Sequence, residues 1–76
     1  MNRNEIWRLE KYLRNLFRLD TITLIERAQS DSVELHIGGE FIAVIFKDEE
    51  DGEVSYALNM AILEIDLPES PASRAG

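Results

Sequence analysis

The spacing of the apolar residues changes once along this chain of 76 residues, near Asp20. Before that point apolar side chains recur at helical spacing, and after it they alternate as they do in strands. One helix followed by strands favours an α+β domain, in which the helix packs on an antiparallel sheet. We therefore predict a single α+β domain over residues 1–67. Residues 68–76, with the sequence PESPASRAG, are expected to form a flexible tail.

The first segment predicts an amphipathic helix that ends near Leu19. Asn2 or Asn4 can cap its N-terminus, and Glu5 in the first turn suits the helix dipole. One stripe of this helix is apolar and is expected to pack on the sheet: Ile6, Leu9, Leu13, Leu16 and Phe17. A second stripe, on the opposite side, is basic and includes an indole: Trp7, Arg8, Lys11, Arg14 and Arg18.

About four strands are expected after the helix, at residues 21–28, 32–37, 40–47 and 53–59. Gly38 and Gly39 predict a two-residue hairpin turn, because both can adopt positive φ without a steric penalty. The expected sheet is therefore an antiparallel meander. Residues 59–67 fit either a continuing or bent strand or a helix, and we favour the strand.

A turn of two glycines sets the expected pairs between the second and third strands: Ile37 with Glu40, Leu35 with Ile42, and Val33 with Val44. The helix would then cover one apolar face: Val33, Leu35, Ile37, Ile42, Val44 and Phe46. The opposite face would carry Phe41, Ala43 and Ile45, beside Glu34 and His36. One helix cannot cover both faces of a sheet. We therefore expect Phe41 and Ile45 to contact a second copy of the chain or another protein, unless residues 60–67 cover them.

The face occupied by Tyr56, Leu58 and Met60 depends on the acidic turn before the fourth strand. With an odd number of turn residues, or with a bulge, these side chains join the face under the helix. With an even number they join Phe41 and Ile45. We favour the first register because it concentrates the apolar groups in one core.

The charge of the chain is unevenly distributed. Its formal net charge is -7, but residues 1–18 hold five basic and two acidic groups. Phosphate contacts need clustered cations, so nucleic acid is not an expected partner, and weak binding through the basic stripe is the one route to it. The basic stripe can instead contact an acidic or aromatic partner, although packing of Trp7 on the edge of its own sheet is the favoured alternative. The candidate contacts on the helix are Trp7, Lys11, Arg14 and Arg18.

The sequence offers no pattern for catalysis, a cofactor or a metal. It has no Cys and one His, and no nucleophile or carboxylate stands at a recognisable spacing from His36. The acidic residues 48–53 do not fit a calcium loop, because with Gly52 as the sixth position the first and twelfth would be Lys47 and Leu58. We expect a solvated hairpin loop there and no enzymatic activity.

The chain also lacks a segment typical of a targeting signal or membrane span. Its longest apolar run, residues 41–46, has six residues. A secretory signal needs an apolar stretch of roughly 7–15 residues and a membrane-spanning helix about 20. We therefore expect a cytoplasmic protein with no membrane partner.

Four segments combine into a specific pattern: EIWRLEKYLRNLF at residues 5–17, IGGEFIAVIF at 37–46, DEEDGEVSY at 48–56 and MAILEIDL at 60–67. This combination resembles the small bacterial domain-of-unknown-function family 3126, found mostly in alphaproteobacteria. The resemblance covers nearly all of residues 4–67. It implies a single-domain cytosolic protein, and it carries no assigned activity, catalytic residue or ligand.

Together these features favour a non-catalytic module that self-associates or binds a protein partner. A domain that binds a small molecule between the helix and the sheet is the alternative from another class. Weak nucleic-acid binding is the third.

Overall fold

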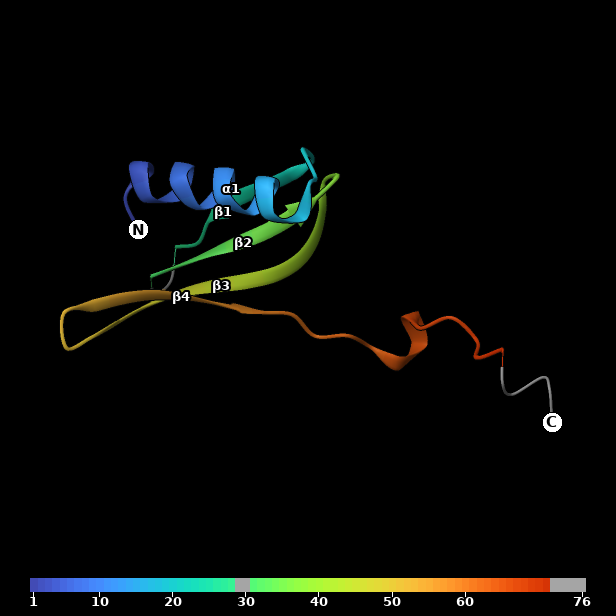
Figure 1. The fold of residues 1–76 in the computed structure, drawn as a ribbon. Helices are drawn as coiled ribbons and strands as arrows, with labels where there is room; N and C mark the ends of the chain where they lie inside the picture. Colours follow the sequence, from blue (N-terminus) through green and yellow to red (C-terminus); the bar gives the residue numbers. More distant parts are fainter. Residues whose placement is uncertain (29–30, 72–76) are drawn as a thin grey trace.

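The computed structural model describes residues 1–28 and 31–71 of the chain and confirms the α+β fold, with one helix on an open antiparallel sheet (Figure 1). Its elements are α1 (Arg3–Phe17), β1 (Ile22–Glu26), β2 (Ser32–Ile37), β3 (Glu40–Glu50), β4 (Glu53–Asn59) and the short 3-10 helix η1 (Glu64–Asp66). The strands pair antiparallel in the order β1-β2-β3-β4, as a meander should. Of the expected flexible tail, residues 72–76 lie outside the described residues, and residues 68–71 belong to no helix or strand.

The N-terminus of α1 is fixed by Asn2, one of the two predicted caps. The Asn2 side chain accepts a hydrogen bond from the Glu5 backbone N–H at 2.8 Å, and the Glu5 carboxylate accepts one from the Asn2 backbone N–H at 3.1 Å. This reciprocal pair is a capping box, which satisfies two backbone donors that have no partner within the helix. The helix ends at Phe17, where Arg18 adopts a left-handed conformation with φ 53°.

The core lies between α1 and the facing side of the sheet. It consists of Leu13, Ile22, Leu24, Val33, Leu35, Ala43 and Ile45. Ile6 and Leu9 are partly buried against it, as the apolar stripe predicts. Leu16 and Phe17 are exposed instead, so the prediction that they join the core is wrong. The reason lies in the placement of α1, which packs mainly against β1 at one side of the sheet.

The hairpin between β2 and β3 differs from the predicted register. Gly38 and Gly39 form the two-residue turn with φ 59° and 85°, and Ile37 faces Glu40 as expected. A β-bulge then inserts Ile42, so Leu35 pairs with Ala43 and Val33 with Ile45 rather than with Ile42 and Val44. Because side chains alternate along a strand, one extra residue moves every following side chain to the other face.

The bulge changes which apolar residues the helix leaves uncovered. Ile45 is 1% exposed and belongs to the core, so the prediction that it lies on the uncovered face is wrong. Phe41 is exposed on that face, as predicted, where it lies opposite His36. Val44 and Phe46, which were expected under the helix, share the face with Phe41.

The same bulge decides on which face of the sheet the side chains of β4 lie. The acidic turn has two central residues, Asp51 and Gly52, so Tyr56 pairs with Lys47, and Leu58 with Ile45. With this even turn, Leu58 lies beside Ile45, as expected for an even number of turn residues. Because the bulge turns Ile45 toward the helix, Tyr56 and Leu58 also lie on the helix side of the sheet. They therefore reach the favoured face through the bulge in β3 and not through an odd turn. Met60 lies beyond the strand and does not join them.

The predicted continuation of the last strand is wrong, because β4 ends at Asn59. Residues 60–67, here named the C-terminal arm, have no regular structure apart from η1. Figure 1 shows this arm running away from the sheet rather than folding back on it. The radius of gyration of the chain is 15.9 Å, against about 11 Å for a compact chain of this length.

Candidate functional site

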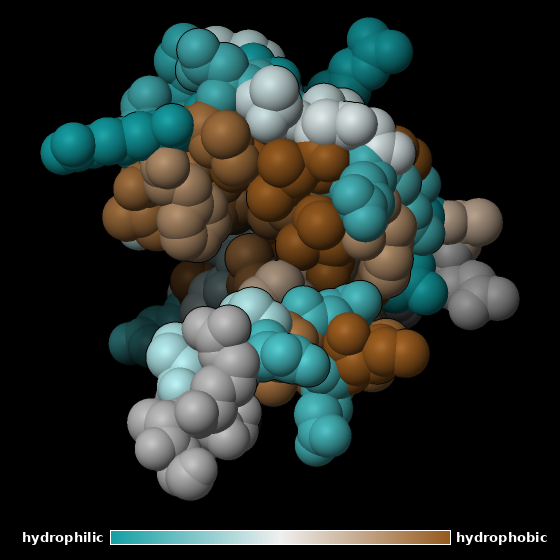
Figure 2. All heavy atoms as spheres, turned by 90° about the vertical axis from the view of Figure 1, so that its right-hand side faces the viewer, coloured by the Kyte–Doolittle hydropathy of each residue, from teal (hydrophilic) through white to brown (hydrophobic). Residues whose placement is uncertain are grey.

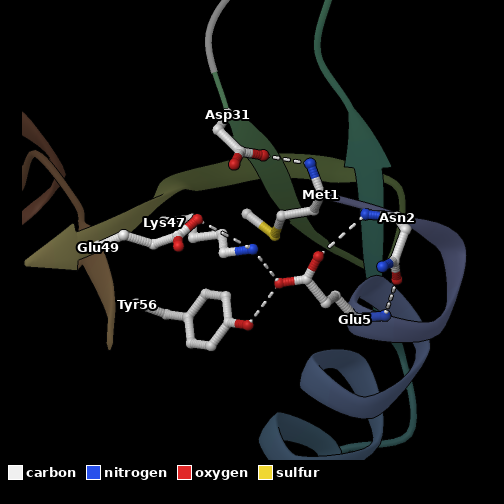
Figure 3. A network of polar contacts seen from close by, with 7 residues as sticks. All are labelled: Met1, Asn2, Glu5, Asp31, Lys47, Glu49 and Tyr56. Atoms are coloured by element: carbon white, nitrogen blue, oxygen red, sulfur yellow. Dashed lines mark hydrogen bonds and ion pairs between the residues drawn. The ribbon is translucent and has the colours of Figure 1, made fainter. Parts of the chain in front are cut away.

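A polar cluster ties the first turn of α1 to β3 and β4 (Figure 3). Oε2 of Glu5 lies 2.6 Å from Nζ of Lys47 and accepts a hydrogen bond from the Tyr56 hydroxyl at 2.9 Å. Oε1 of the same carboxylate accepts the Asn2 N–H at 3.1 Å. Nearby, the N-terminal amine of Met1 pairs with Asp31. Glu5 is therefore the point at which three elements meet.

Glu5, Lys47 and Tyr56 each keep one charge state around neutral pH. The Lys47 ammonium, followed by the Asn2 N–H and the Tyr56 hydroxyl, lowers the pKa of Glu5 to about 2. The hydrogen bond to Glu5 in turn raises the pKa of Lys47 and, helped by desolvation, that of Tyr56. A general acid or base works best with a pKa near the working pH. These shifts move all three groups away from that range, and their contacts join α1 to β3 and β4.

Sequence reasoning found only part of this cluster. Glu5 was assigned to the helix dipole, but Tyr56 is 51 residues away from it in the chain. The sequence favours the helix side for Tyr56 because that placement concentrates the apolar groups in one core, but it leaves the other face open. The partner of Tyr56 depends on where the helix lies over the sheet, which no local pattern contains.

A second polar contact covers the outer edge of β1. The Leu24 N–H donates to Oε2 of Glu10 at 2.9 Å, and Nε of Arg14 donates to the Ile22 carbonyl at 2.8 Å. Glu10 and Arg14 are also paired with each other at 3.2 Å. The edge strand thus has backbone groups satisfied by helix side chains, which discourages pairing with another chain there.

The candidate contacts of the basic stripe are therefore not equivalent. Arg14 is engaged within the chain, which corrects the prediction that its guanidinium is available to a partner. Lys11 and Arg18 are exposed, and Trp7 is 62% exposed. With this exposure the Trp7 indole is accessible to a partner, and packing on the edge of its own sheet leaves most of it uncovered.

The face under α1 is incompletely covered on the side of β4. A groove of about 530 Å³ lies between them, with Leu9, Leu13 and Ile45 toward the core and Val54 and Leu58 along β4. Arg8 and Tyr12 from α1 also line it. The groove exists because α1 packs mainly on β1, at the other side of the sheet.

A second hollow, of about 670 Å³, lies between β3 and the C-terminal arm. Apolar side chains line it from both sides: Phe41, Val44 and Phe46 from β3, and Met60 and Leu63 from the arm. Figure 2 looks at the end of the molecule from which the arm leaves and shows apolar surface around a hollow. This hollow combines the uncovered sheet face with the exposed arm.

His36 has ordinary structural contacts on the same uncovered face. Its Nε2 lies 2.9 Å from Oε1 of Glu34, and its ring meets the Phe41 ring edge-on with centroids 5.7 Å apart. Within residues 1–28 and 31–71, no group of three His, Cys, Asp or Glu side chains is placed to hold a metal ion.

The fold and these surfaces define a small α+β domain with one protected sheet edge, one open edge and an apolar arm. The chain belongs to the family described as Protein of unknown function (DUF3126), whose model matches residues 5–66. This confirms the resemblance seen in the sequence. The match extends through residues 60–66, so the arm is part of the family domain.

No curated protein and no solved structure matches the chain. In the part of the chain that the structure describes, no helix is both long and apolar enough to cross a membrane.

Proposed function

We propose that the chain is a non-catalytic protein–protein interaction module. The observation that carries this proposal is the apolar C-terminal arm, whose large side chains are exposed and where Ile65 reaches 88% exposure. Exposed apolar patches of this kind mark contact sites in soluble proteins, because leaving them in water is unfavourable. The family match through residue 66 supports a role for the arm within the domain.

The two edges of the sheet support the same proposal. Glu10 and Arg14 occupy the outer edge of β1. On its outer side β4 pairs with no strand among the described residues, and all seven of its residues are exposed. A free edge strand beside apolar surface is a template for association with another chain.

The proposal also includes a non-catalytic role for the Glu5 cluster and a cytoplasmic location. The Glu5 cluster has fixed charge states near neutral pH, which suits an anchor better than a catalyst. We place the module in the cytoplasm of a bacterium, as the resemblance implies.

The mass of the native assembly tests the proposal. The endogenous protein, released gently from its own cells, is expected to elute in an assembly heavier than one chain when followed by antibody and light scattering. Elution at the monomer mass, at every concentration, would contradict the proposed function.

A small-molecule-binding domain is the second candidate, and the groove between α1 and β4 favours it. Its volume of about 530 Å³ lies within the usual range of ligand pockets, roughly 300–1,000 Å³. The groove is open along the exposed strand β4, however, whereas ligand sites bury most of their ligand. Native mass spectrometry of protein purified from its own cells separates the two candidates, because a bound small molecule adds a discrete mass to the single chain.

Nucleic-acid binding is less favoured than either. Arg14 is held by Glu10 and the Ile22 carbonyl, which removes one cation from an already sparse stripe. Retention on heparin at low salt would revive this possibility.

A further inference from the structure

The edge strand β4 is shorter than its neighbour β3, which leaves a place for a further strand beside β3. β3 has 11 residues and β4 has seven. β4 pairs with residues 44–50 of β3, and the last pair is Val44 with Asn59. Among the described residues, no strand therefore pairs with residues 40–43 on the side where β4 would continue. We call this unpaired stretch the β3 slot.

The arm of the same chain does not fill the β3 slot. If the register of β4 continued, Met60 would face Ala43 and Leu63 would face Glu40. The bulge at Ile42 instead bends β3 toward α1, while the arm continues away from the sheet (Figure 1). Bulges bend a strand and increase its twist, so the slot and its own arm diverge at this point.

The arm has the sequence of a strand that is buried on both faces. Met60 and Ile62 alternate with Ala61 and Leu63, so both sides are apolar up to Leu63; beyond it Glu64 and Asp66 are polar on one side, and Ile65 and Leu67 stay apolar on the other. Strands covered on both sides have such continuous apolar runs, whereas strands exposed on one side alternate apolar with polar. All of these arm residues are nevertheless exposed in the single chain.

The excess surface has the size of an interface between two chains. The accessible surface is 6280 Å², whereas a compact monomer of this mass exposes about 4,700 Å². The excess, roughly 1,500 Å², belongs to the whole chain and is not confined to the arm. A standard interface buries about 800 Å² per partner, so burial of about half of this excess on each chain suffices for a dimer.

We propose that two copies of the chain exchange their C-terminal arms, with each arm seated in the β3 slot and the adjoining hollow of the other copy. The inference rests on the proposed function as an interaction module and names its partner as a second copy. The arm matches the slot because the slot is where the strand would continue within one chain. In this exchange each copy contributes one arm and one β3 slot, so all arms and slots are filled in a symmetric dimer.

Sedimentation velocity of the purified full chain at micromolar concentration tests this proposal. The wild-type chain is expected to be a dimer. Leu63→Asp places a charge in the exchanged arm and is expected to raise the dissociation constant about 100-fold or more, because it removes one buried leucine from each of two sites. Leu16→Asp is the matched control, since Leu16 is 55% exposed and Leu63 57%. This control is expected to remain dimeric.

Mixed cysteine variants report the exchange directly, because the natural chain has no Cys. Chains with Glu40→Cys and chains with Leu63→Cys are refolded together from urea and oxidised. The continued register brings these positions opposite each other across two chains, close enough for a disulfide. A disulfide between the two different chains is expected. Replacing Glu40→Cys by Asn15→Cys on α1 is expected to abolish it.

The outcomes separate this inference from the proposed function. A monomeric purified chain, or a dimer affected equally by Leu63→Asp and Leu16→Asp, would overturn the arm exchange. A dimer without the disulfide between chains would overturn it as well. In each case a heavier assembly of the endogenous protein would still support an interaction module with another partner.

Discussion

Lys47 on β3 and Glu5 in the first turn of α1 form an ion pair of 2.6 Å that joins the helix to the middle of the sheet. Both side chains are largely shielded from solvent, each with 15% exposure. Tyr56 on β4 donates to the same carboxylate oxygen. Glu5 thereby links α1, which packs mainly on β1, to β4, along which the groove opens.

Removing the charge of Glu5 is expected to make stability less dependent on acid. The folded pKa is about 2, below the unfolded value of about 4.3. The contribution of Glu5 is therefore present above about pH 4.3 and is lost as the pH falls toward 2. Urea unfolding of Glu5→Gln and wild type should differ at pH 7 and converge near pH 2. Glu49→Gln, which removes the longer 3.5 Å contact to Lys47, should show a smaller difference.

Arg14→Met is expected to destabilise the fold by about 1–2 kcal/mol, because it leaves the Ile22 carbonyl without its side-chain donor and removes the ion pair with Glu10. Lys11→Met on the exposed part of the same helix should change the free energy of unfolding by less than about 0.5 kcal/mol. Urea denaturation at one fixed protein concentration measures both. Equal effects of the two variants would show that Arg14 does not hold the edge of β1.

The turn between β2 and β3 is expected to require glycine at one position more than at the other. Gly39 has φ 85° and Gly38 has φ 59°. A Cβ at either position meets no atom within 4 Å, so the cost arises in the backbone alone. Gly38→Asn should be nearly neutral, since asparagine tolerates the left-handed region in which φ 59° lies. Gly39→Asn should destabilise by about 1 kcal/mol or more, because φ 85° lies outside that region. Thermal unfolding of both variants tests this order.

Two leucines on one helix should differ sharply when truncated. Leu13 is buried among β-strand side chains, whereas Leu16 is exposed. Leu13→Ala should lower the free energy of unfolding by about 2–5 kcal/mol, and Leu16→Ala by less than about 0.5 kcal/mol. A large loss for Leu16→Ala alone would mean that the helix is rotated relative to the arrangement described above. Circular dichroism during urea titration provides the measurement.

The fold was largely predictable because its signals are local. The capping residue Asn2, the apolar spacing of the first segment and the turn at Gly38 and Gly39 each depend on a few neighbouring residues. Such signals place helices, strands and turns. They also gave the order of the meander, since each strand here pairs with its neighbour in the sequence.

The assignment of faces was less predictable, because it depends on a single inserted residue. The bulge at Ile42 sent Ile45 into the core and Phe46 to the uncovered side. No residue in IGGEFIAVIF distinguishes a regular hairpin from a bulged one. The expectation of an uncovered apolar face nevertheless holds for Phe41, because the pairs nearest the turn precede the bulge.

By itself, the sequence determined one helix, four strands and an apolar final segment, because backbone preferences and apolar spacing act over a few residues. The tertiary structure alone decided that α1 lies over β1, that Arg14 is engaged at its edge and that Glu5 meets Lys47 and Tyr56. It also decided that the arm leaves the sheet at Asn59. These features depend on how distant segments pack and bend against one another, which no short stretch of sequence specifies.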